Sequence, residues 1–356
     1  MNEIKTVKIH CLSTAVSPLT HMMGTSGNES IINRTRIIAD GRICDVPVIS
    51  GNAIRHRMVR EPGAMFIIKT CELMGKLTVD VANYLFYGGS LTDSAIADNL
   101  RRIADMQELL PLYRLLGGSL KNQVISGSLL VSMGTLVCEE NREVLGKLLP
   151  EEMLPGLPEL RSCEDFVSGW QYTRGDISKK PEIIKDADAA RMAVDTETGE
   201  ITEIHAPSKS NLMIYGGQHV IPGAIFYHSF VLQNVSRLEV GALYAAIKDW
   251  QADGGVIGGQ GRIGHGKLDT VIYPEGNNFF GDAVDLEAYE QEYREHTKVN
   301  APKIIDWLTD AFAVKVKTGS PRAAKVGKSV TASGSKEIKN PVAVMDLFNA
   351  EAEELF

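Results

Sequence analysis

The sequence lacks the features that mark exported, membrane-spanning or disulfide-stabilised proteins. Its five cysteines are scattered, with no CxxC pair and no neighbouring histidine at the spacing of metal ligands. This usage argues against disulfides and structural zinc, and it favours a reducing cytoplasm. No signal peptide opens the chain, and no apolar run approaches the roughly 18 residues that a membrane helix needs. We therefore expect a cytoplasmic protein without a membrane partner, a bound metal or a cofactor.

Positive charge is also scarce overall. The formal net charge of the 356 residues is −8, so the protein as a whole is not a basic coat for nucleic acid. Any site for a polyanion must then be a local patch. A hydrophobic content of 44% supports a sizeable core, either in one domain with large insertions or in two domains.

The stretch from Val46 to Arg60, VPVISGNAIRHRMVR, predicts a strand that leads into a helix capped by Ser50. At the α-helical period, the apolar residues fall on one face and His56, Arg57 and Arg60 fall on the other. The free amide groups and the positive end of the macrodipole at the head of such a helix favour an anion such as phosphate. The alternative is that the arginines form only the solvated face of the helix.

Three further arginines, Arg34, Arg36 and Arg42, precede this helix. Before them come a predicted first strand, from Thr6 to Leu12, and the segment from His21 to Asn28, which its glycines predict to be a flexible loop. A solvated face gives no reason to concentrate arginine in an acidic chain. The clustering therefore favours the anion site.

The rest of the chain alternates helical and strand patterns around one polar segment. This segment, 168–210, carries the turn signal Thr196 to Glu200 between two short strand-like runs, which predicts a projecting hairpin arm. The other predicted elements are helices at 66–74, 92–116 and 239–250, a buried strand pair within 124–137, a polar connector at 139–161, and strands at 225–232 and 267–273.

A glycine-rich loop follows the predicted helix at 239–250. Gly259, Gly261 and Gly264 match the GxGxxG fingerprint of dinucleotide-binding proteins. That fingerprint works only between a strand and a helix, because the pyrophosphate rests on the helix N-terminus. Here the glycines follow a helix and precede a strand, so we discard the Rossmann interpretation.

The bare amide groups of this loop could instead approach a phosphodiester chain. Three polar side chains accompany them: Gln260, Arg262 and His265. The alternative is a glycine hairpin at a tight corner of a sheet.

Four motifs together resemble one protein family. VISGNAIRHRMVR is similar to the motif after the first strand in backbone subunits of class 1 CRISPR effector complexes, members of the repeat-associated mysterious protein (RAMP) superfamily. The likeness continues in the same order through LYRLLGGSLKNQVISGSLLVS (112–132), VIPGAIFYHSFVL (220–232) and GGVIGGQGRIGHGKL (254–268). The arm, the YTRGD at 172–176 and the length favour the type IV variant and leave type I relatives open.

The resemblance implies an α+β fold, with a palm like an RNA-recognition motif or ferredoxin spanning 1–312. Helical fingers would be inserted at 61–120, and a β-hairpin thumb would protrude at 168–212. Copies of the chain would polymerise along a guide RNA (crRNA), distort it periodically with their thumbs, and present it for pairing with target DNA or RNA. Other subunits of the complex would join them in defence against viruses and plasmids.

The same resemblance implies roles for individual residues. Guide phosphates would be held by Ser50, Gly51, Asn52, Arg55 and Arg57, and by Gln260, Arg262 and His265. A flipped nucleotide would lie near His21, Met22 and Met23. The predicted RNA-binding set is completed by Arg34, Arg36, His56, Arg60, Arg174, Gly261 and Gly264.

The chain departs from relatives of this family in two ways. It has no K/R-G-F/Y-G/A-F run of stacking aromatics, so we expect recognition of backbone and shape. Related type III subunits cut RNA with an aspartate in the loop after the first strand, whereas the only acid here between Ser13 and Arg36 is Glu29. We expect no catalytic residue, because metal-assisted hydrolysis needs clustered carboxylates. The alternative is a metal-dependent ribonuclease that uses Glu29.

The C-terminal segment, 313–356, is predicted to be a basic linker followed by a helix. Between Lys315 and Lys339 it carries many lysines and a single acid, in a composition that cannot bury a core. Pro341 to Phe356 has the pattern of a short amphipathic helix. Our hypothesis is that this segment clamps neighbouring copies together, and the alternative is a dispensable tail.

Overall fold

Alternating apolar residues create the two long strands at the centre of the main sheet. Strand β1 (Lys5–Ala15) buries every second side chain, and β14 (Ile225–Val235) follows the same period. They pair antiparallel, and β15 (Leu268–Pro274) pairs antiparallel with the other edge of β1. The strands predicted at 6–12, 225–232 and 267–273 are confirmed.

In this computed structural model the described residues are 5–91, 100–121, 123–157, 159–173, 192–194, 201–203 and 214–312. They all lie within one compact unit, residues 1–313. The predicted basic linker and C-terminal helix at 313–356 lie outside the described residues.

The main sheet has the strand order β15-β1-β14-β9-β5-β4, with β8 beside β14. Its remaining strands are β4 (Arg34–Ala39), β5 (Arg42–Ile49), β8 (Leu129–Val131) and β9 (Gly134–Leu136). One helical run connects β5 to the next strands of the sheet, and α7 connects β14 to β15. The central strand order β15-β1-β14-β9, with one helical connection before β9 and a second between β14 and β15, is that of a ferredoxin-like fold. The predicted α+β fold is confirmed.

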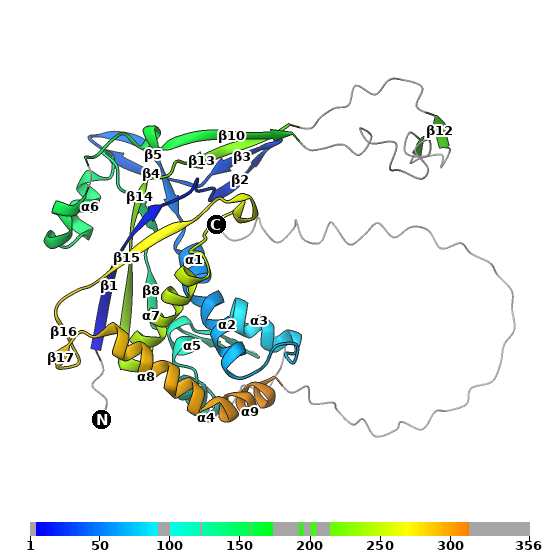
Figure 1. The fold of residues 1–356 in the computed structure, drawn as a ribbon, viewed down its shortest axis with the longest axis vertical. Coiled ribbons are helices and arrows are strands. Elements are labelled where there is room, and N and C mark those ends of the chain that lie inside the picture. The colour runs from blue at the N-terminus through cyan, green and yellow to red at the C-terminus, as the bar shows by residue number, and fades with distance from the viewer. Residues whose placement is uncertain are drawn as a thin grey trace, which may run out of the picture. The chain divides into compact units, whose positions relative to one another are not determined.

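Helices cover the sheet on both sides (Figure 1). The main layer contains the continuous run α1 (Gly51–Ile54), η1 (Arg55–Arg60) and α2 (Glu61–Thr70), with α7 (Arg237–Ala252), α8 (Leu286–Val299) and α9 (Ala301–Ala311). On the opposite face, α6 (Arg142–Leu148) packs Leu145 and Leu149 around Tyr227 of β14. Among the described residues, no helix combines the length and apolar character that crossing a membrane requires.

The helix predicted at 239–250 is confirmed as α7, which begins with a capping box. The Ser236 side chain accepts from the third amide of the helix, and the Glu239 carboxylate accepts from the Ser236 amide at 2.7 Å. Its glycine, Gly241, allows α8 to approach closely, because a Cβ there would lie 1.9 Å from the Tyr289 carbonyl oxygen. The capping box and this contact fix α7 between the sheet and α8.

Two predicted elements differ from the structure, and one helix was not predicted. The single helix predicted at 92–116 is divided, because Pro111 ends α4 (Leu100–Leu109) and begins α5 (Pro111–Leu116), and 92–99 lie outside the described residues. Helix α3 (Val79–Tyr87) was not predicted. The strands within 124–137 do not pair with each other: β7 (Gln123–Ile125) pairs with β6 (Gly118–Leu120), whereas β8 and β9 pair with β14.

A second sheet, of order β10-β13-β3-β2, stands beside the first. It contains β2 (Met22–Ser26), β3 (Glu29–Ile32), β10 (Val167–Thr173) and β13 (Ile214–Val220). The flexible loop predicted at 21–28 was therefore wrong, because this segment forms a β2–β3 hairpin that turns at Gly27, whose φ is +60°. Exposed strands lack the apolar alternation that reveals buried ones.

Strands β10 and β13 pair at the two ends of the segment predicted as a hairpin arm. Within it, β11 (Met192–Val194) and β12 (Ile201–Glu203) pair antiparallel around the predicted turn. The turn, 195–200, and the connections 174–191 and 204–213 lie outside the described residues.

The remaining short elements are β16 (Asn278–Phe279), β17 (Asp282–Ala283) and 3-10 turns at Glu151–Gly156, Cys163–Phe166 and Gly261–Ile263.

A buried histidine on β14 gives the fold a pH-dependent stability. His228 Nε2 lies 2.9 Å from Ser13 Oγ, and burial lowers the pKa of His228 to about 3. Below the unfolded pKa of about 6.5, the unfolded chain binds a proton that the folded chain excludes. Stability should therefore fall as pH drops from about 6.5 towards 3, by about 1.4 kcal/mol per pH unit from this group.

Chemical denaturation across this pH range tests the contribution of His228. In the variant His228→Gln, which keeps a polar side chain near Ser13, the acid limb of the stability curve should be shallower. An unchanged slope below pH 6.5 would contradict the assignment.

Candidate nucleic-acid interface

Three motifs that are distant in sequence meet at one place, which we call the junction. It consists of Thr20–Met23, Ser50–Asn52 and the glycine loop Gly258–His265. The Gly259 amide donates to the Thr20 carbonyl at 2.7 Å, and Thr20 Oγ1 lies 2.7 Å from His265 Nδ1. The Ser50 amide donates to His21 Nε2 at 3.1 Å. The structure thus brings together most of the residues that the sequence predicted to contact RNA.

The helix begins at the junction as predicted. Ser50 is its N-cap, and its Oγ accepts from the Ala53 amide at 3.2 Å. Gly51 runs close to β8, because a Cβ there would lie 3.0 Å from the Val131 carbonyl oxygen. A pocket of about 530 Å³ opens here, lined by Ser50, Gly51, Asn52, Arg55, Gly127, Leu129, Leu130, Val131 and Met133. The first amides of a helix and its positive dipole end suit an anion in this pocket.

Arg55 lines this pocket, but its Nε–H is buried. Its Nη2 donates to the Leu116 carbonyl, whereas its buried Nε–H has no hydrogen-bond partner among the described residues. Burial also lowers the pKa of Arg55. A buried donor without a partner costs about 1–3 kcal/mol, and Nε is too enclosed in this structure for a ligand oxygen to reach it.

The cationic helix face differs from the predicted one, because residues 55–60 form a π-helical turn. A π-turn bonds five residues apart instead of four, which rotates the following side chains relative to an α-helix. Arg57 pairs with Glu61 at 2.6 Å, and the His56 ring stacks on Tyr87 at 5.8 Å between centroids. Both side chains remain partly exposed.

Arg60 requires a correction, because it does not lie on the exposed face. It is 6% exposed, and its guanidinium donates to the carbonyls of Tyr84 at 3.5 Å and Gly117 at 3.2 Å. The guanidinium carbon also lies 5.9 Å from the centroid of the Tyr113 ring. Arg60 therefore joins the C-terminal ends of α3 and α5 inside the protein.

The glycine loop approaches Thr20 closely enough to require glycine. Gly258 has a φ of +83°, and a Cβ on it would lie 2.6 Å from the Thr20 carbonyl oxygen. Gln260 also adopts a left-handed conformation, with φ of +61°, and Arg262 beside it is exposed, without an ion pair to any described residue. The loop follows α7 and precedes β15, so the discarded Rossmann interpretation stays discarded.

Two methionines lie on the outer side of the junction. Met22 and Met23 are 40% and 68% exposed, and Met22 Cε would lie 3.2 Å from a Cβ on Gly259. They form a soft apolar edge next to the polar groups of the glycine loop.

Three predicted arginines are not brought to the junction by the described contacts. Arg34 pairs with Glu164 at 2.5 Å, and Arg36 pairs with Asp45 at 3.2 Å, both on the β4–β5 hairpin. Arg174 lies outside the described residues. The two paired arginines have acidic partners that an incoming phosphate would have to replace.

Sequence reasoning missed a row of aromatic side chains that leads away from the junction. Trp170 and Tyr172 of β10 stack at 5.6 Å between ring centroids, and Tyr172 stacks on Tyr215 of β13 at 5.4 Å. At the other end, His265 lies edge-on to Trp170 at 6.4 Å and to His219 at 5.9 Å. We call these five residues the aromatic row. The aromatic residues at every second position in WQY (170–172), and the tyrosine and histidine that begin and end YGGQH (215–219), were the signal that could have revealed this row.

The histidines around the junction are uncharged at neutral pH. Burial lowers the pKa of His21 and of His265, and burial together with His265 lowers that of His219. A neutral His21 is required for its Nε2 to accept from the Ser50 amide. These rings therefore act through hydrogen bonds and stacking at neutral pH, not through charge.

Glu29, the residue of the nuclease alternative, is exposed at the start of β3. It pairs with Ser26 across the hairpin and with Gly216 of β13. Within the described ranges, no three His, Cys, Asp or Glu side chains are grouped so that they could hold a metal ion.

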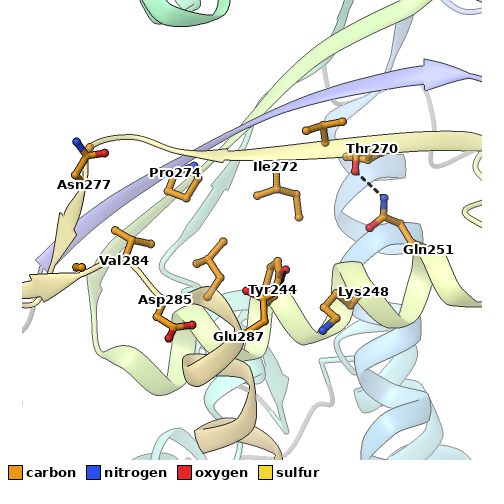
Figure 2. A pocket seen from close by; sticks show the side chains of 14 residues that line it. Tyr244, Lys248, Gln251, Thr270, Ile272, Pro274, Asn277, Val284, Asp285 and Glu287 are labelled. Carbon is orange, nitrogen blue, oxygen red and sulfur yellow. Dashed lines mark hydrogen bonds between the residues drawn. The ribbon is translucent and has the colours of Figure 1, made fainter.

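A second pocket, of about 650 Å³, lies between β15, α7 and the start of α8 (Figure 2). Several of its polar groups are already engaged: Gln251 donates to the Thr270 carbonyl at 2.7 Å, and the Tyr244 hydroxyl donates to Glu287 at 2.6 Å. Lys248 pairs with Glu290 at 2.6 Å. Because these donors and acceptors satisfy one another, they are not free to bind a ligand.

The fold of this chain is similar to that of solved structures, among them a chain of a CRISPR complex. No protein-family model matches the chain, and a search of curated proteins finds no match. A solved chain described as "Type IV-B CRISPR Complex" superposes with a TM-score of 0.50 at 18% sequence identity. The alignment covers 75% of this chain and 90% of that one. The protein therefore shares the α+β fold of that chain of a CRISPR complex.

Proposed function

We propose that the protein is a subunit of a CRISPR ribonucleoprotein complex that binds guide RNA through its phosphate backbone. The observation that carries this proposal is the junction, where hydrogen bonds join His21, the capped helix and the glycine loop. Those are the motifs whose resemblance to RAMP backbone subunits implied RNA contacts. A protein that needed them only for folding would have no reason to gather exposed donors at their meeting point.

The donors at the junction suit phosphate oxygens. The start of the helix offers amide groups, Arg55 lines the pocket beside it, and the exposed guanidinium of Arg262 has no ion pair among the described residues. None of these groups distinguishes one base from another, which fits a guide of any sequence. We further propose that copies assemble along the guide, with other subunits, and present it to target DNA or RNA.

The likeness of fold supports this proposal. The similar chain belongs to an assembly described as a "Type IV-B CRISPR Complex", and the alignment covers most of that chain. The motif order resembles the RAMP superfamily independently of the superposition, and both likenesses support a CRISPR complex. We therefore favour the type IV variant.

We propose that the subunit does not cut RNA, against the alternative of a type III-like ribonuclease. Glu29 lies in a strand pair, and the neighbouring strand residues named above are serine and glycine. Metal-assisted hydrolysis uses clustered carboxylates that hold one or two ions. A lone glutamate in that setting supports a structural role.

Fluorescence anisotropy with labelled single-stranded RNA tests the binding mode. If phosphates supply most contacts, log K should fall linearly with log salt, by about −0.7 per neutralised phosphate, for any RNA sequence. Arg262→Ala should make the slope shallower by about one phosphate, because the free guanidinium of Arg262 is lost. Arg142→Ala, which removes an exposed arginine from α6, is the matched control and should leave the slope unchanged.

Three outcomes would contradict the proposal. Salt-insensitive binding, or strong preference for one sequence, would mean that phosphates do not dominate. Metal-dependent cleavage of the same labelled RNA, lost in Glu29→Ala, would establish the ribonuclease instead.

RNA recovered with the protein from its native host should form a ladder of small guide-sized species.

A further inference from the structure

The aromatic row lies on one face of the β10–β13 ribbon, next to the junction. Trp170 and Tyr172 lie two residues apart on β10. In the pairing with β13, Tyr172 lies opposite Tyr215, and Trp170 lies opposite Gly217. Side chains two residues apart share a face of a strand. The three rings, with His219 further along β13, therefore share one surface.

The indole of Trp170 leans across this surface instead of standing upright. A Cβ on Gly217 would lie 3.0 Å from Trp170 Cε2, so the ring covers the bare backbone of that glycine. The ring planes of Trp170 and Tyr172 differ by 9°, and those of Tyr172 and Tyr215 by 19°. These three nearly parallel rings, of which Trp170 covers a glycine, form a platform with a common orientation.

This platform is partly open to solvent. Tyr172 is 46% exposed, and Trp170 is partly exposed. The Trp170 Nε1–H and His219 Nδ1 have no hydrogen-bond partner among the described residues. Folding alone gains little from an aromatic surface that remains exposed and has unsatisfied polar atoms.

We propose that the platform stacks the bases of single-stranded nucleic acid. Aromatic rings on a sheet are a general surface for bases, since every base has a π-face, and a neighbouring cationic site tracks the backbone. Here His265 belongs to both the junction and the aromatic row, which places phosphate donors directly beside the stacking surface. The neutral state of His219 and His265 suits stacking at neutral pH.

This inference rests on the proposed function and adds a mode that the sequence did not predict. Backbone recognition alone needs no aromatic groups. The platform adds base contacts that are tolerant of sequence, so the two modes are compatible. They differ in one measurable respect, which is whether the base itself contributes to binding.

Tryptophan fluorescence reads the platform directly. Trp250 and Trp307 are 5% and 7% exposed and lie in the core, so Trp170 is the tryptophan that a ligand can reach among the three in the chain. The full chain is titrated with an oligouridylate, an oligoadenylate and an oligomer of equal length whose riboses carry no bases. Base-bearing RNA should quench Trp170 and bind about tenfold more tightly than the abasic oligomer.

Three variants assign the effect. Trp170→Phe should remove the quenching but keep most of the preference for bases, and Tyr172→Ala should reduce that preference several-fold. Tyr273→Ala, which removes a 37% exposed tyrosine from β15 of the main sheet, is the matched control and should change neither. Thermal melts of each variant show that it is folded.

The outcomes separate this inference from the proposed function. Equal affinity for abasic and base-bearing RNA, without quenching, would overturn the platform and leave backbone binding intact. Absence of binding to every oligomer would overturn both. Quenching by a protein subunit of the purified complex, but not by RNA, would make the platform a protein-docking surface and overturn base stacking.

Discussion

Arg60→Ala should lower the free energy of unfolding by about 3 kcal/mol, although the residue belongs to the arginine-rich stretch. The guanidinium supplies donors to the Tyr84 and Gly117 carbonyls, which lie near the C-terminal ends of α3 and α5. Truncation removes the Arg60 donor from the Gly117 carbonyl and opens a cavity beside Tyr113, whereas the Tyr84 carbonyl keeps its bond from the Gly88 amide. Urea denaturation measures the change. Arg60→Met, which restores volume without donors, should recover only part of it.

Arg57→Ala is the matched control for Arg60. Its guanidinium pairs with Glu61 one turn along the same helical run, and both side chains are more than one-third exposed. We expect less than about 1 kcal/mol of destabilisation. Equal stability losses for the two variants would show that the buried hydrogen bonds of Arg60 do not stabilise the fold.

Gly258→Ala should weaken RNA binding by at least about tenfold while the protein stays folded. The left-handed φ of Gly258 strains any other residue, and the new Cβ would lie 2.6 Å from the Thr20 carbonyl oxygen. The loop must then move away from Thr20, which separates His265 and Arg262 from the capped helix. Anisotropy titrations at fixed salt measure the loss, and circular dichroism reports whether the variant keeps its secondary structure.

Gly24→Ala is the control for this loop variant. Gly24 also lies near the junction, in β2, but a Cβ there would meet nothing within 4 Å. Its RNA affinity should stay within about twofold of the original protein. If Gly258→Ala bound RNA equally well, the contact between the glycine loop and Thr20 would not be needed for binding.

The sequence predicted the elements whose signal is local. Strands β1 and β14 were found because they are partly buried and alternate, and α7 was found because its apolar residues recur at the helical period. Ser50 was identified as a cap because that role depends on a few neighbouring residues.

The failures depend on non-local geometry. The angular position of Arg60 could not be predicted, because a π-helical turn changes the projection of every later side chain. The β2–β3 hairpin is exposed, and β3 gains its place by pairing with β13, nearly 200 residues away. The aromatic row likewise arises only when β10 and β13 pair across the arm. Local patterns carry no information about such partners.

The position of β1 also governs when the protein can fold during synthesis. This strand is made among the first residues, yet both its neighbours, β14 and β15, are made more than 200 residues later. At about 5–20 residues per second, a ribosome needs on the order of ten seconds or more to supply them. Throughout that interval β1, which buries every second side chain in the folded protein, has two open edges, so we expect chaperones to bind it.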